Sequence, residues 1–549
     1  MLNRIGVAAV LLLVSTLCVA DEGGASHGIW SLLPAFITIV IALLLRSVIP
    51  ALFIGLWLGA SLVNGLSPMG ILEGLFATAQ TYVVNVLADS DRATIIVFTC
   101  LIAGMVGITT RNGAMKSLVD RVISVARTRN SAQLSVGGMG LIIFFDDYAN
   151  TLVVGNTARA MTDRLKVSRE KLAYLVDATA APIACLALVS TWIGYEVSLI
   201  DDAIKDLQGL PPTSAYLLFV NSLAYSFYPI LAIVFVFMVG GTGRDFGPML
   251  TAENRALGGD IGAQSSGAGD DEMQAAEGAN SPISFAILPI VAVLVTLGAG
   301  LYLTGEGESL VDIVGSADAY KAMIWSSLVG TLVAFLTTLI GRTLTLDDTV
   351  SAWFGGLRSV LPGVIVLILA WALSEVTSEL GAADYVVQHL SDAIKPELLP
   401  VLVFLLAAVT AFGTGASWGT MAILVPLVVP LCWALLVANG QTADLHILYS
   451  SIACVLTGAV WGDHCSPISD TTVLSSIASG CDHVEHVRTQ LPYALSVGVV
   501  SILLGTLPSA FGLSPFICMI LGGITLFVLL KKLGRPAGQP GGEPAHDGA

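Results

Sequence analysis

Charged residues are scarce in this sequence. Only 12% of the 549 residues are Asp, Glu, Lys or Arg, whereas a soluble globular protein carries about 25%. Hydrophobic residues make up 55% of the chain, and they come in blocks of about 20 residues, the length of a membrane-spanning helix. This balance excludes an ordinary soluble enzyme and predicts an all-α, polytopic integral membrane protein.

Basic residues and paired cysteines are also lacking. The 24 Lys and Arg residues face 40 Asp and Glu residues, a formal net charge of −16. This balance argues against a nucleic-acid partner, because phosphate binding needs clustered cations. The eight Cys residues show no paired spacing, and most lie inside apolar runs. We therefore expect neither a disulfide framework nor a zinc site, and no cofactor.

The N-terminal segment, residues 1–28, has two interpretations. Arg4, the apolar run 5–17 and the small residues around Ala20 are typical of a cleavable signal peptide. The same stretch could instead remain as an extra N-terminal span. The sequence leaves both open.

Apolar blocks along the rest of the chain predict about 11–12 transmembrane helices, counted with that N-terminal segment. The candidate spans are 29–45, 48–66, 93–110, 172–200, 214–239, 283–304, 322–341, 359–380, 447–479, 491–512 and 515–530.

Two further apolar segments, 134–158 and 398–437, do not fit as simple spans. The segments 111–129 and 159–171 hold ten of the 24 basic residues, and the positive-inside rule places both in the cytoplasm. The segment 134–158 between them is too short for two crossings of about 20 residues each. It therefore predicts a re-entrant hairpin with its tip at 144–151.

The two halves of the chain resemble each other. Alternating acidic and basic loops place the hairpin base of the first copy inside and that of the second outside. This predicts two inverted-topology repeats, each with a re-entrant hairpin and a broken helix, and a cytoplasmic C-terminus. The segments that recur in order are 109–114 with 377–382, 144–151 with 412–420, and 177–183 with 463–468. The expected domains are transmembrane repeat 1 at 29–240, a disordered acidic, Gly-rich cytoplasmic linker at 241–282, transmembrane repeat 2 at 283–531 and a disordered cytoplasmic tail at 532–549.

Acidic residues inside the predicted spans are the candidate functional groups. A charge at mid-bilayer costs about 2.5–3.5 kcal/mol on insertion scales, so each one is a functional hypothesis. We expect no Lys or Arg well inside any span, so a mobile cation must neutralise these acids. The candidates are Asp146, Asp147, Asp177, Asp463 and Asp470.

Hydroxyl and amide side chains surround these acids, and they are hard oxygen donors of the kind that bind Na⁺. A buried carboxylate binds either a proton or such a cation, and this competition is sufficient for antiport. The candidate ligands beside the acids are Asn150, Thr151, Thr414, Ser417, Thr420, Ser466, Ser469 and Thr471.

Several of these residues have a structural alternative. Asp146 could lie in water at the base of the hairpin. Asp470 could cap the helix that follows it, and Asp177 could pair with Lys171 at the membrane edge. His464 could relay protons or serve as a hydrogen-bonded structural histidine.

Three segments, 144–155, 413–420 and 462–472, resemble the NhaC family of sodium/proton antiporters, inverted-repeat carriers of the wider ion transporter superfamily. The resemblance covers residues 30–512. It implies a bacterial inner-membrane carrier that exchanges Na⁺ or Li⁺ for H⁺, and it leaves room for a homodimer. The motif positions carry over to Asp146, Asp147, Asn150, Thr151, Ser417, Thr420, Asp463, Ser466, Ser469, Asp470 and Thr471.

Two other functions stay open. Related carriers exchange organic substrates such as malate for lactate, so an organic-anion or amino-acid exchanger on the same scaffold is an alternative. An intramembrane hydrolase is another, because 415–419 matches the G-x-S-x-G pattern and Ser417 could be paired with His464 and Asp463. That motif lacks its strand–turn–helix setting here, so we expect no enzyme.

Overall fold

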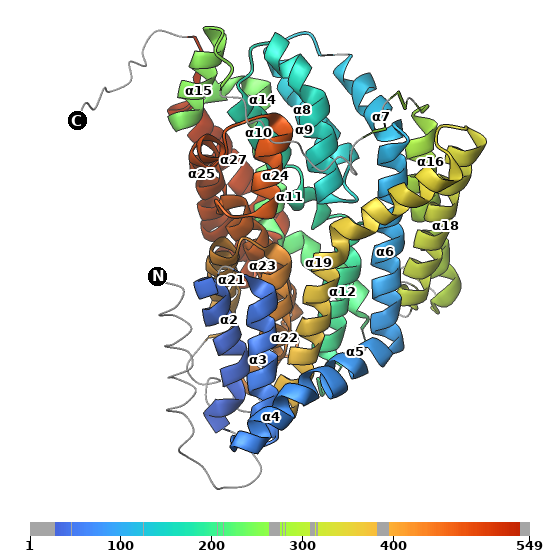
Figure 1. Cartoon of the computed structure of the whole chain (residues 1–549). Coiled ribbons are helices and arrows are strands. Elements are labelled where there is room, and N and C mark those ends of the chain that lie inside the picture. Colours follow the sequence, from blue (N-terminus) through green and yellow to red (C-terminus); the bar gives the residue numbers. More distant parts are fainter. Residues whose placement is uncertain are drawn as a thin grey trace.

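The computed structural model describes residues 28–45, 47–124, 126–205, 207–211, 213–262, 275–276, 278–279, 281–307, 313, 317–381 and 395–538. Nearly all of the predicted signal peptide or extra span lies outside these residues. The described chain is a long bundle of helices, with the segments before residue 262 interleaved with those after it (Figure 1).

The helices and strands divide into two sets along the chain. The first set is η1 (Gly28–Leu32), α2 (Leu33–Leu45), α3 (Val48–Val63), α4 (Pro68–Ala77), η2 (Thr78–Val83), α5 (Val84–Ala88), α6 (Ser90–Arg111), α7 (Ala114–Ile123), α8 (Arg129–Ile142), α9 (Asp147–Arg164), α10 (Arg169–Asp177), α11 (Ala181–Ala184), α12 (Thr191–Ile204), α13 (Ala215–Ser222), η3 (Leu223–Tyr225), α14 (Phe227–Thr242), β1 (Arg244–Asp245) and α15 (Gly247–Leu257). The second set is α16 (Ser284–Thr304), α18 (Ala319–Ile340), α19 (Leu346–Glu379), η5 (Pro396–Leu398), α21 (Leu399–Thr414), α22 (Ser417–Ala438), α23 (Leu445–Cys465), α24 (Asp470–Ser479), α25 (His483–Val500), η6 (Ser501–Thr506), α26 (Leu507–Ala510), α27 (Pro515–Leu533) and β2 (Arg535–Pro536).

Ten helical segments of the described chain are long and apolar enough to cross a membrane, or up to eleven if the bent pair α13 and α14 is one span. This confirms the expected all-α, polytopic membrane protein. The sequence prediction overlooked one of them, Pro68–Ala88. The reason is that Glu73, Gln80 and Asn85 interrupt its apolar run.

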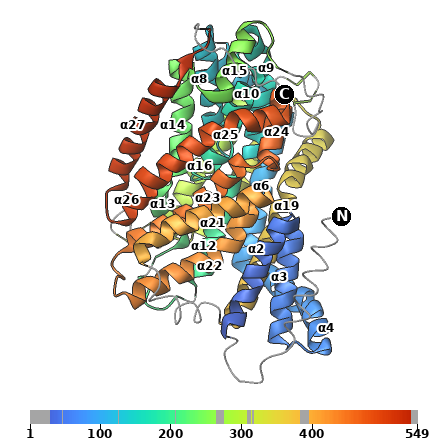
Figure 2. The ribbon, with the colours of Figure 1, turned by 90° about the vertical axis from the view of Figure 1, so that its left-hand side faces the viewer.

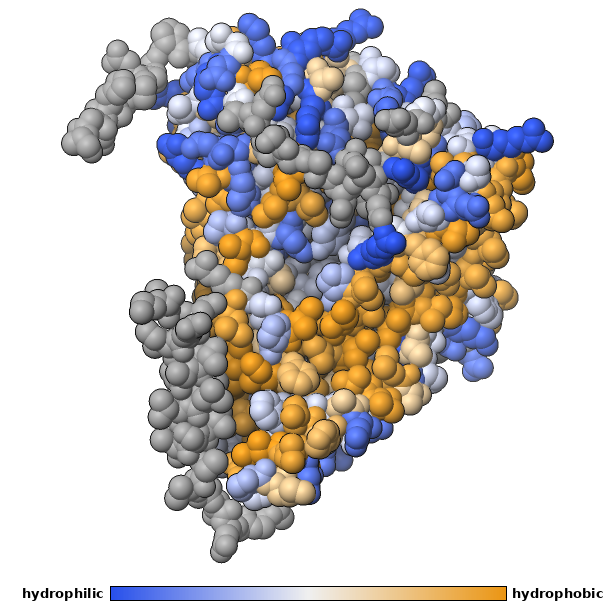
Figure 3. Space-filling model, in the orientation of Figure 1, coloured by the Kyte–Doolittle hydropathy of each residue, from blue (hydrophilic) through white to orange (hydrophobic). Residues whose placement is uncertain are grey.

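Large exposed hydrophobic side chains lie on α16, α18 and α27, as expected where helices face lipid. Hydrophobic residues cover the middle of the face in Figure 3, and hydrophilic residues gather toward its upper end. After a quarter turn, α27 lies at the edge of the molecule beside α14 (Figure 2).

Two helical hairpins are present where the sequence predicts re-entrant segments. In the first, α8 and α9 meet at residues 143–146, and α9 continues to Arg164. Arg159 and Arg164 therefore lie on a helix rather than in a loop, contrary to expectation. In the second, Pro396–Thr414 and Ser417–Ala438 are each long enough to cross a membrane. Gly415 turns this hairpin with a φ of +67°, and a side chain there would meet the carbonyl of Ile468.

The predicted spans 172–200 and 447–479 are both broken. The first divides into α10, α11 and α12, and the second into α23 and α24. The last piece of each span starts with a serine cap: Ser190 accepts hydrogen bonds at the start of α12, and Ser469 does so at the start of α24. In space, α9 packs against α24, and α22 packs against α12.

The expected disordered linker and tail are wrong in part. Within 241–282, β1 pairs antiparallel with β2 of the C-terminal segment, and α15 packs against α10 and α25. Arg129 binds Glu253 of α15 at 2.5 Å, and the backbone N–H of Ser168 donates to the same carboxylate at 2.8 Å. The sequence did not predict α15 because the linker as a whole is rich in Gly. The most acidic part of the linker and residues 539–549 lie outside the described residues.

Close approach of α6 and α19 gives a stability prediction. A methyl group at Gly356 would overlap the backbone carbonyl of Ala103, whereas one at Gly298 on α16 would meet nothing within 4 Å. We expect Gly356→Ala to lower stability by about 1–3 kcal/mol through overpacking, measured by thermal unfolding in detergent. The matched Gly298→Ala variant should unfold at or above the wild-type temperature. Equal behaviour of the two variants would contradict this packing.

Candidate functional site

Four helices begin around one cavity of about 100 Å³. They are α9, α12, α22 and α24, and each sends residues from its first turn into the cavity wall. Free N–H groups and the helix dipole favour negative charge at such ends. The lining residues are Asp146, Asp147, Tyr148, Thr191, Ser359, Val360, Pro362, Gly363, Val366, Ala416, Ser417, Trp418, Gly419 and Asp470.

Asp146 joins two of these helix ends. One carboxylate oxygen accepts from the backbone N–H of Ala149 at 2.7 Å, and the other accepts from the Thr191 hydroxyl at 3.2 Å. The backbone N–H of Thr191 donates to the carbonyl of Phe145 at 2.9 Å. Asp146 is only 1% exposed, so the alternative that it lies in water is wrong.

Asp147 is buried in the cavity wall with little support from the protein. Its side chain is 2% exposed, and its Oδ1 accepts no hydrogen bond from the described residues. A buried acceptor left unpaired costs about 1–3 kcal/mol, and more when it is charged. A bound proton or cation would remove that cost.

Asp470 is the acid that the solvent reaches, because its side chain is exposed. The Tyr148 hydroxyl donates to its Oδ2, and the backbone N–H of Thr471 donates to its Oδ1 at 2.8 Å. Ser469 occupies the capping position of α24. Asp470 is therefore the first residue of the helix rather than its cap, and it lines the opening of the cavity.

Asp463 lies behind the first turn of α24 and is not part of the cavity wall. It is 1% exposed and accepts a hydrogen bond from the Thr471 hydroxyl at 3.3 Å, which in turn contacts the Ser469 hydroxyl at 3.0 Å. Its Oδ1 accepts no hydrogen bond from the described residues. Asp463 therefore contacts the first turn of α24, the helix that carries Asp470 to the cavity wall.

Asn150 holds the backbone instead of facing the cavity. Its side-chain NH₂ contacts the carbonyls of Gly140, Ile143 and Thr179 at 2.8, 3.1 and 2.9 Å. These bonds join the turn of the first hairpin to the break that follows α10. Its amide oxygen accepts no hydrogen bond from the described residues, so its role as an ion ligand stays a prediction.

Several other predicted ligands are not among the residues that line the cavity, although Ser417 is. Thr414 and Thr420 donate to carbonyls of their own helical segments, those of Thr410 and Ala416. Ser466 donates to the carbonyl of Phe412 at 2.8 Å and so attaches the break after α23 to the second hairpin. Thr151 is buried, and its hydroxyl has no hydrogen-bond partner among the described residues.

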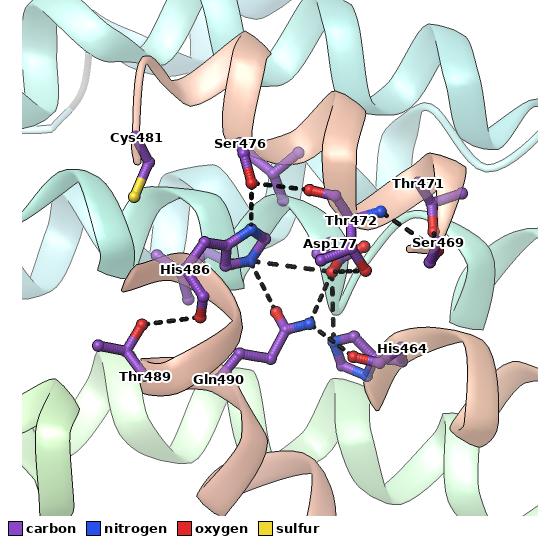
Figure 4. Close-up of polar contacts among 12 residues, drawn as sticks. Asp177, His464, Ser469, Thr471, Thr472, Ser476, Cys481, His486, Thr489 and Gln490 are labelled. Carbon is purple, nitrogen blue, oxygen red and sulfur yellow. Dashed lines mark hydrogen bonds and ion pairs between the residues drawn. The ribbon is translucent and has the colours of Figure 1, made fainter. Parts of the chain in front are cut away.

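Asp177 belongs to a second polar cluster (Figure 4). Its Oδ2 accepts from the Thr472 hydroxyl at 3.0 Å and from Gln490 Nε2 at 2.7 Å. The Nε2 atoms of His464 and His486 lie 4.0 and 3.8 Å from the same oxygen. Four helices, α10, α23, α24 and α25, therefore meet at one carboxylate.

The alternative that Asp177 pairs with Lys171 is wrong. Lys171 is fully buried and pairs with Asp245, which also accepts from the Tyr493 hydroxyl at 2.6 Å. Lys171 lies one residue before the predicted span 172–200, on the short helix α10. No Lys or Arg lines the cavity among the residues described.

His464 is fixed by two neighbours. Its Nδ1 lies 2.6 Å from the Tyr228 hydroxyl, and its Nε2 faces Asp177. Both ring nitrogens are therefore directed away from a role as base for Ser417, which the hydrolase alternative would need.

The sequence did not identify two buried charged residues, Glu196 and Arg92. Glu196 on α12 is fully buried, and neither of its carboxylate oxygens accepts a hydrogen bond from the described residues. The Cys185 thiol lies beside it. Glu196 lies within the predicted span 172–200, so the same search for intramembrane acids would have found it. Arg92 on α6 is 7% exposed and pairs with Asp202 and Glu375.

The chain is similar to one family model and to several bacterial proteins. The model of the Na⁺/H⁺ antiporter family matches residues 183–507. An uncharacterized protein of Haemophilus influenzae is 30% identical over 525 residues, which span 92% of this chain and 96% of that protein. The malate-2H⁺/Na⁺-lactate antiporter of Bacillus subtilis is 27% identical over 174 residues, 31% of this chain and 35% of that protein.

A solved structure shares the fold. The YdaH transporter of Alcanivorax borkumensis superposes with a TM-score of 0.59 at 13% identity, over 88% of this chain and 99% of that one.

The position of Asn150 gives a second stability prediction. Asn150→Asp places a carboxylate against three carbonyl oxygens, and an uncompensated buried charge costs about 3–5 kcal/mol. We expect a large fall in the unfolding temperature in detergent at neutral pH. Asn439→Asp, at the exposed end of α22, is the control and should change stability by no more than about 0.5 kcal/mol. A stable Asn150→Asp variant would show that Asn150 does not hold the hairpin.

Proposed function

The chain belongs to the Na⁺/H⁺ antiporter family, and on this premise we propose that it exchanges Na⁺ for H⁺ across the bacterial inner membrane. The observation that carries the proposal is a single cavity lined by Asp146, Asp147 and Asp470, with no Lys or Arg among its described lining residues. The NhaC-like segments 144–155 and 462–472 supply these acids.

A cation is the ligand that fits this wall. The carboxylates are joined there by the hydroxyls of Thr191 and Ser417, so every side-chain group that could coordinate an ion is a hard oxygen donor suited to Na⁺ or Li⁺. Protons bind the same carboxylates. Na⁺ and protons therefore compete for the same carboxylates, and this competition couples the two fluxes.

Pairing of the helices supports alternating access. The cavity lies between elements of both predicted repeats, because α9 and α12 belong to 29–240 and α22 and α24 to 283–531. Hairpin helix α9 contacts broken-helix piece α24, and hairpin helix α22 contacts broken-helix piece α12. An inverted-topology repeat would produce such an exchange of partners, and rocking of the repeats would expose the site to each side in turn.

The orientation in the membrane is part of the proposal. Lys531 and Lys532 end α27, and basic residues of the segments 111–129 and 159–171 surround the other helix ends that we place in the cytoplasm. The C-terminus is accordingly cytoplasmic.

An organic-anion exchanger is the second candidate, since the matching antiporter of Bacillus subtilis is named for malate and lactate. The four helix ends would attract a carboxylate. Three aspartates in the same wall would repel it, however. The cavity of about 100 Å³ is also smaller than the cavity of about 150 Å³ that holds a single benzene ring. The observed conformation therefore favours a small cation.

Removing a carboxylate from the cavity tests the proposal. In proteoliposomes with an imposed pH gradient, a Na⁺ pulse should move protons through the wild-type protein, and choline should not. Asp147→Asn and Asp470→Asn should reduce that flux to the level of empty liposomes, because the residual groups cannot exchange Na⁺ for a proton. The proton flux is measured with a pH-sensitive dye.

Asp120→Asn, on the exposed side of α7, is the matched control and should retain the wild-type flux. Full Na⁺-driven flux in a correctly folded Asp147→Asn variant would contradict the proposal. If Na⁺ and Li⁺ drive no proton flux through the wild-type protein but labelled malate is exchanged, the organic-anion alternative is established.

A further inference from the structure

A chain of hydrogen bonds runs from a half-exposed histidine to the buried Asp177. His483 is the first residue of α25 and is partly open to solvent. The Ser476 hydroxyl oxygen lies 3.0 Å from His483 Nδ1 and 2.8 Å from His486 Nδ1. Figure 4 shows the inner contact, with His486 between Ser476 and Asp177. One hydroxyl thus bridges two imidazole rings of the same helix.

The ring of His483 is oriented by a backbone carbonyl. Its Nε2 lies 2.7 Å from the carbonyl oxygen of Pro467. A carbonyl oxygen only accepts hydrogen bonds, so His483 carries a hydrogen on Nε2. Its Nδ1 is the nitrogen turned to Ser476.

The ring of His486 is oriented in the same way by a side chain. Gln490 donates its NH₂ to Asp177 Oδ2 at 2.7 Å and to the carbonyl of His464 at 2.6 Å. Because both partners accept hydrogen bonds, the nitrogen of the Gln490 amide must face them. The amide oxygen then faces His486 Nε2 at 2.8 Å. His486 therefore also carries a hydrogen on Nε2 and presents Nδ1 to Ser476.

Ser476 can satisfy both protonation states of either ring. Its oxygen lies 2.8 Å from the carbonyl of Thr472, so the hydroxyl has an alternative acceptor. A neutral ring accepts the hydroxyl hydrogen at Nδ1. A cationic ring donates from Nδ1 to the hydroxyl oxygen, and the hydroxyl then donates elsewhere.

We propose that His483, Ser476 and His486 form a proton-transfer path that loads a proton onto His486 beside Asp177. The path rests on the proposed function and names the route of its protons. The Nδ1–H bond of a cationic His483 breaks as its proton bonds to Ser476 Oγ, and the former hydroxyl proton bonds to His486 Nδ1. The serine keeps one proton, and one positive charge moves from His483 to His486.

The neighbour of His486 that attracts a positive charge is Asp177. Asp177 is 1% exposed and lies 3.8 Å from His486 Nε2. The titratable groups that face His486 are Asp177 from α10, His464 from α23 and His483 from its own helix. From α14, the Tyr228 hydroxyl contacts His464. From α24, the Ser476 hydroxyl contacts His486. On α15, the charged side chains at 253 and 255 bind Arg129 and Glu170 instead.

The stored proton is coupled to the ion cavity through α24. Thr472, which donates to Asp177 at 3.0 Å, follows Asp470 by two residues in the first turn of that helix. Neutralising Asp177 with a cationic His486 weakens the negative field on this turn. Protonation is therefore felt at the carboxylate that lines the cavity opening.

Ser476→Ala tests the path, and Ser479→Ala on the same helix is the control, because the buried Ser479 hydroxyl has no hydrogen-bond partner among the described residues. We expect Ser476→Ala to slow Na⁺-driven proton flux about tenfold or more and to change its solvent isotope effect. Exchange of labelled Na⁺ for Na⁺, which moves no proton, should remain at the wild-type rate in both variants.

Equal loss of proton flux and Na⁺/Na⁺ exchange in Ser476→Ala would overturn the path, since the serine would then be structural. Unchanged proton flux would overturn it as well. His483→Gln, at a half-exposed position with little folding risk, is the second variant and should give the same selective loss.

A readout that needs no cargo separates this path from the proposed function. Nitrogen NMR of labelled histidine should show rapid proton exchange at His486 Nδ1 in wild type and slow exchange in Ser476→Ala. If the NMR shows this difference but the protein does not exchange Na⁺ for H⁺, the proposed function is contradicted and the proton-transfer path is supported. Equal exchange rates in wild type and Ser476→Ala would overturn the path itself.

Discussion

Carboxylates enclosed by helices, with no Lys or Arg among the described residues of their cavity wall, are the constraint on which the rest of this structure depends. Asp146 and Asp147 are buried, and Asp470 closes the same cavity from its open side. Burial of unpaired charge is costly in any protein and more so within a bilayer. The chain offsets this cost with the N-terminal ends of four helices, and the remainder must come from a bound proton or cation. Stability and transport therefore depend on the same electrostatic balance.

The interruptions of the helices follow from that balance. A continuous span has no free N–H groups in its middle, so helix ends can reach the centre of the protein only where a hairpin turns or a span breaks. Gly415 makes one such turn, and Ser190 and Ser469 cap the pieces that follow the breaks. The bonds of Asn150 and Ser466 then attach hairpins to breaks. Hydroxyl and amide groups near the acids thus fix the backbone more often than they face the cavity.

Local sequence signals predicted most of the spans, both hairpin segments and the acids of the cavity, because apolar length and isolated charge act within a short stretch of chain. They did not predict which polar groups share a site. Asp177 and Asp463 are as buried as Asp146, yet each lies outside the cavity wall, and only the packing of α24 separates them from it. The contribution of α19 through Pro362 and Gly363 also depends on tertiary contact. The cluster of basic residues predicts a loop at Lys171, and no local signal reveals its partner, Asp245, because that residue lies far along the chain.

The central claim is that Na⁺ and protons compete for the carboxylates of one cavity. The most direct measurement is calorimetric titration of Na⁺ into the purified protein in buffers with different heats of ionisation, which counts the protons released per bound Na⁺. The account predicts proton release on binding and an apparent Na⁺ affinity that weakens as the pH falls. Saturable Na⁺ binding without proton release and with an affinity independent of pH would contradict it.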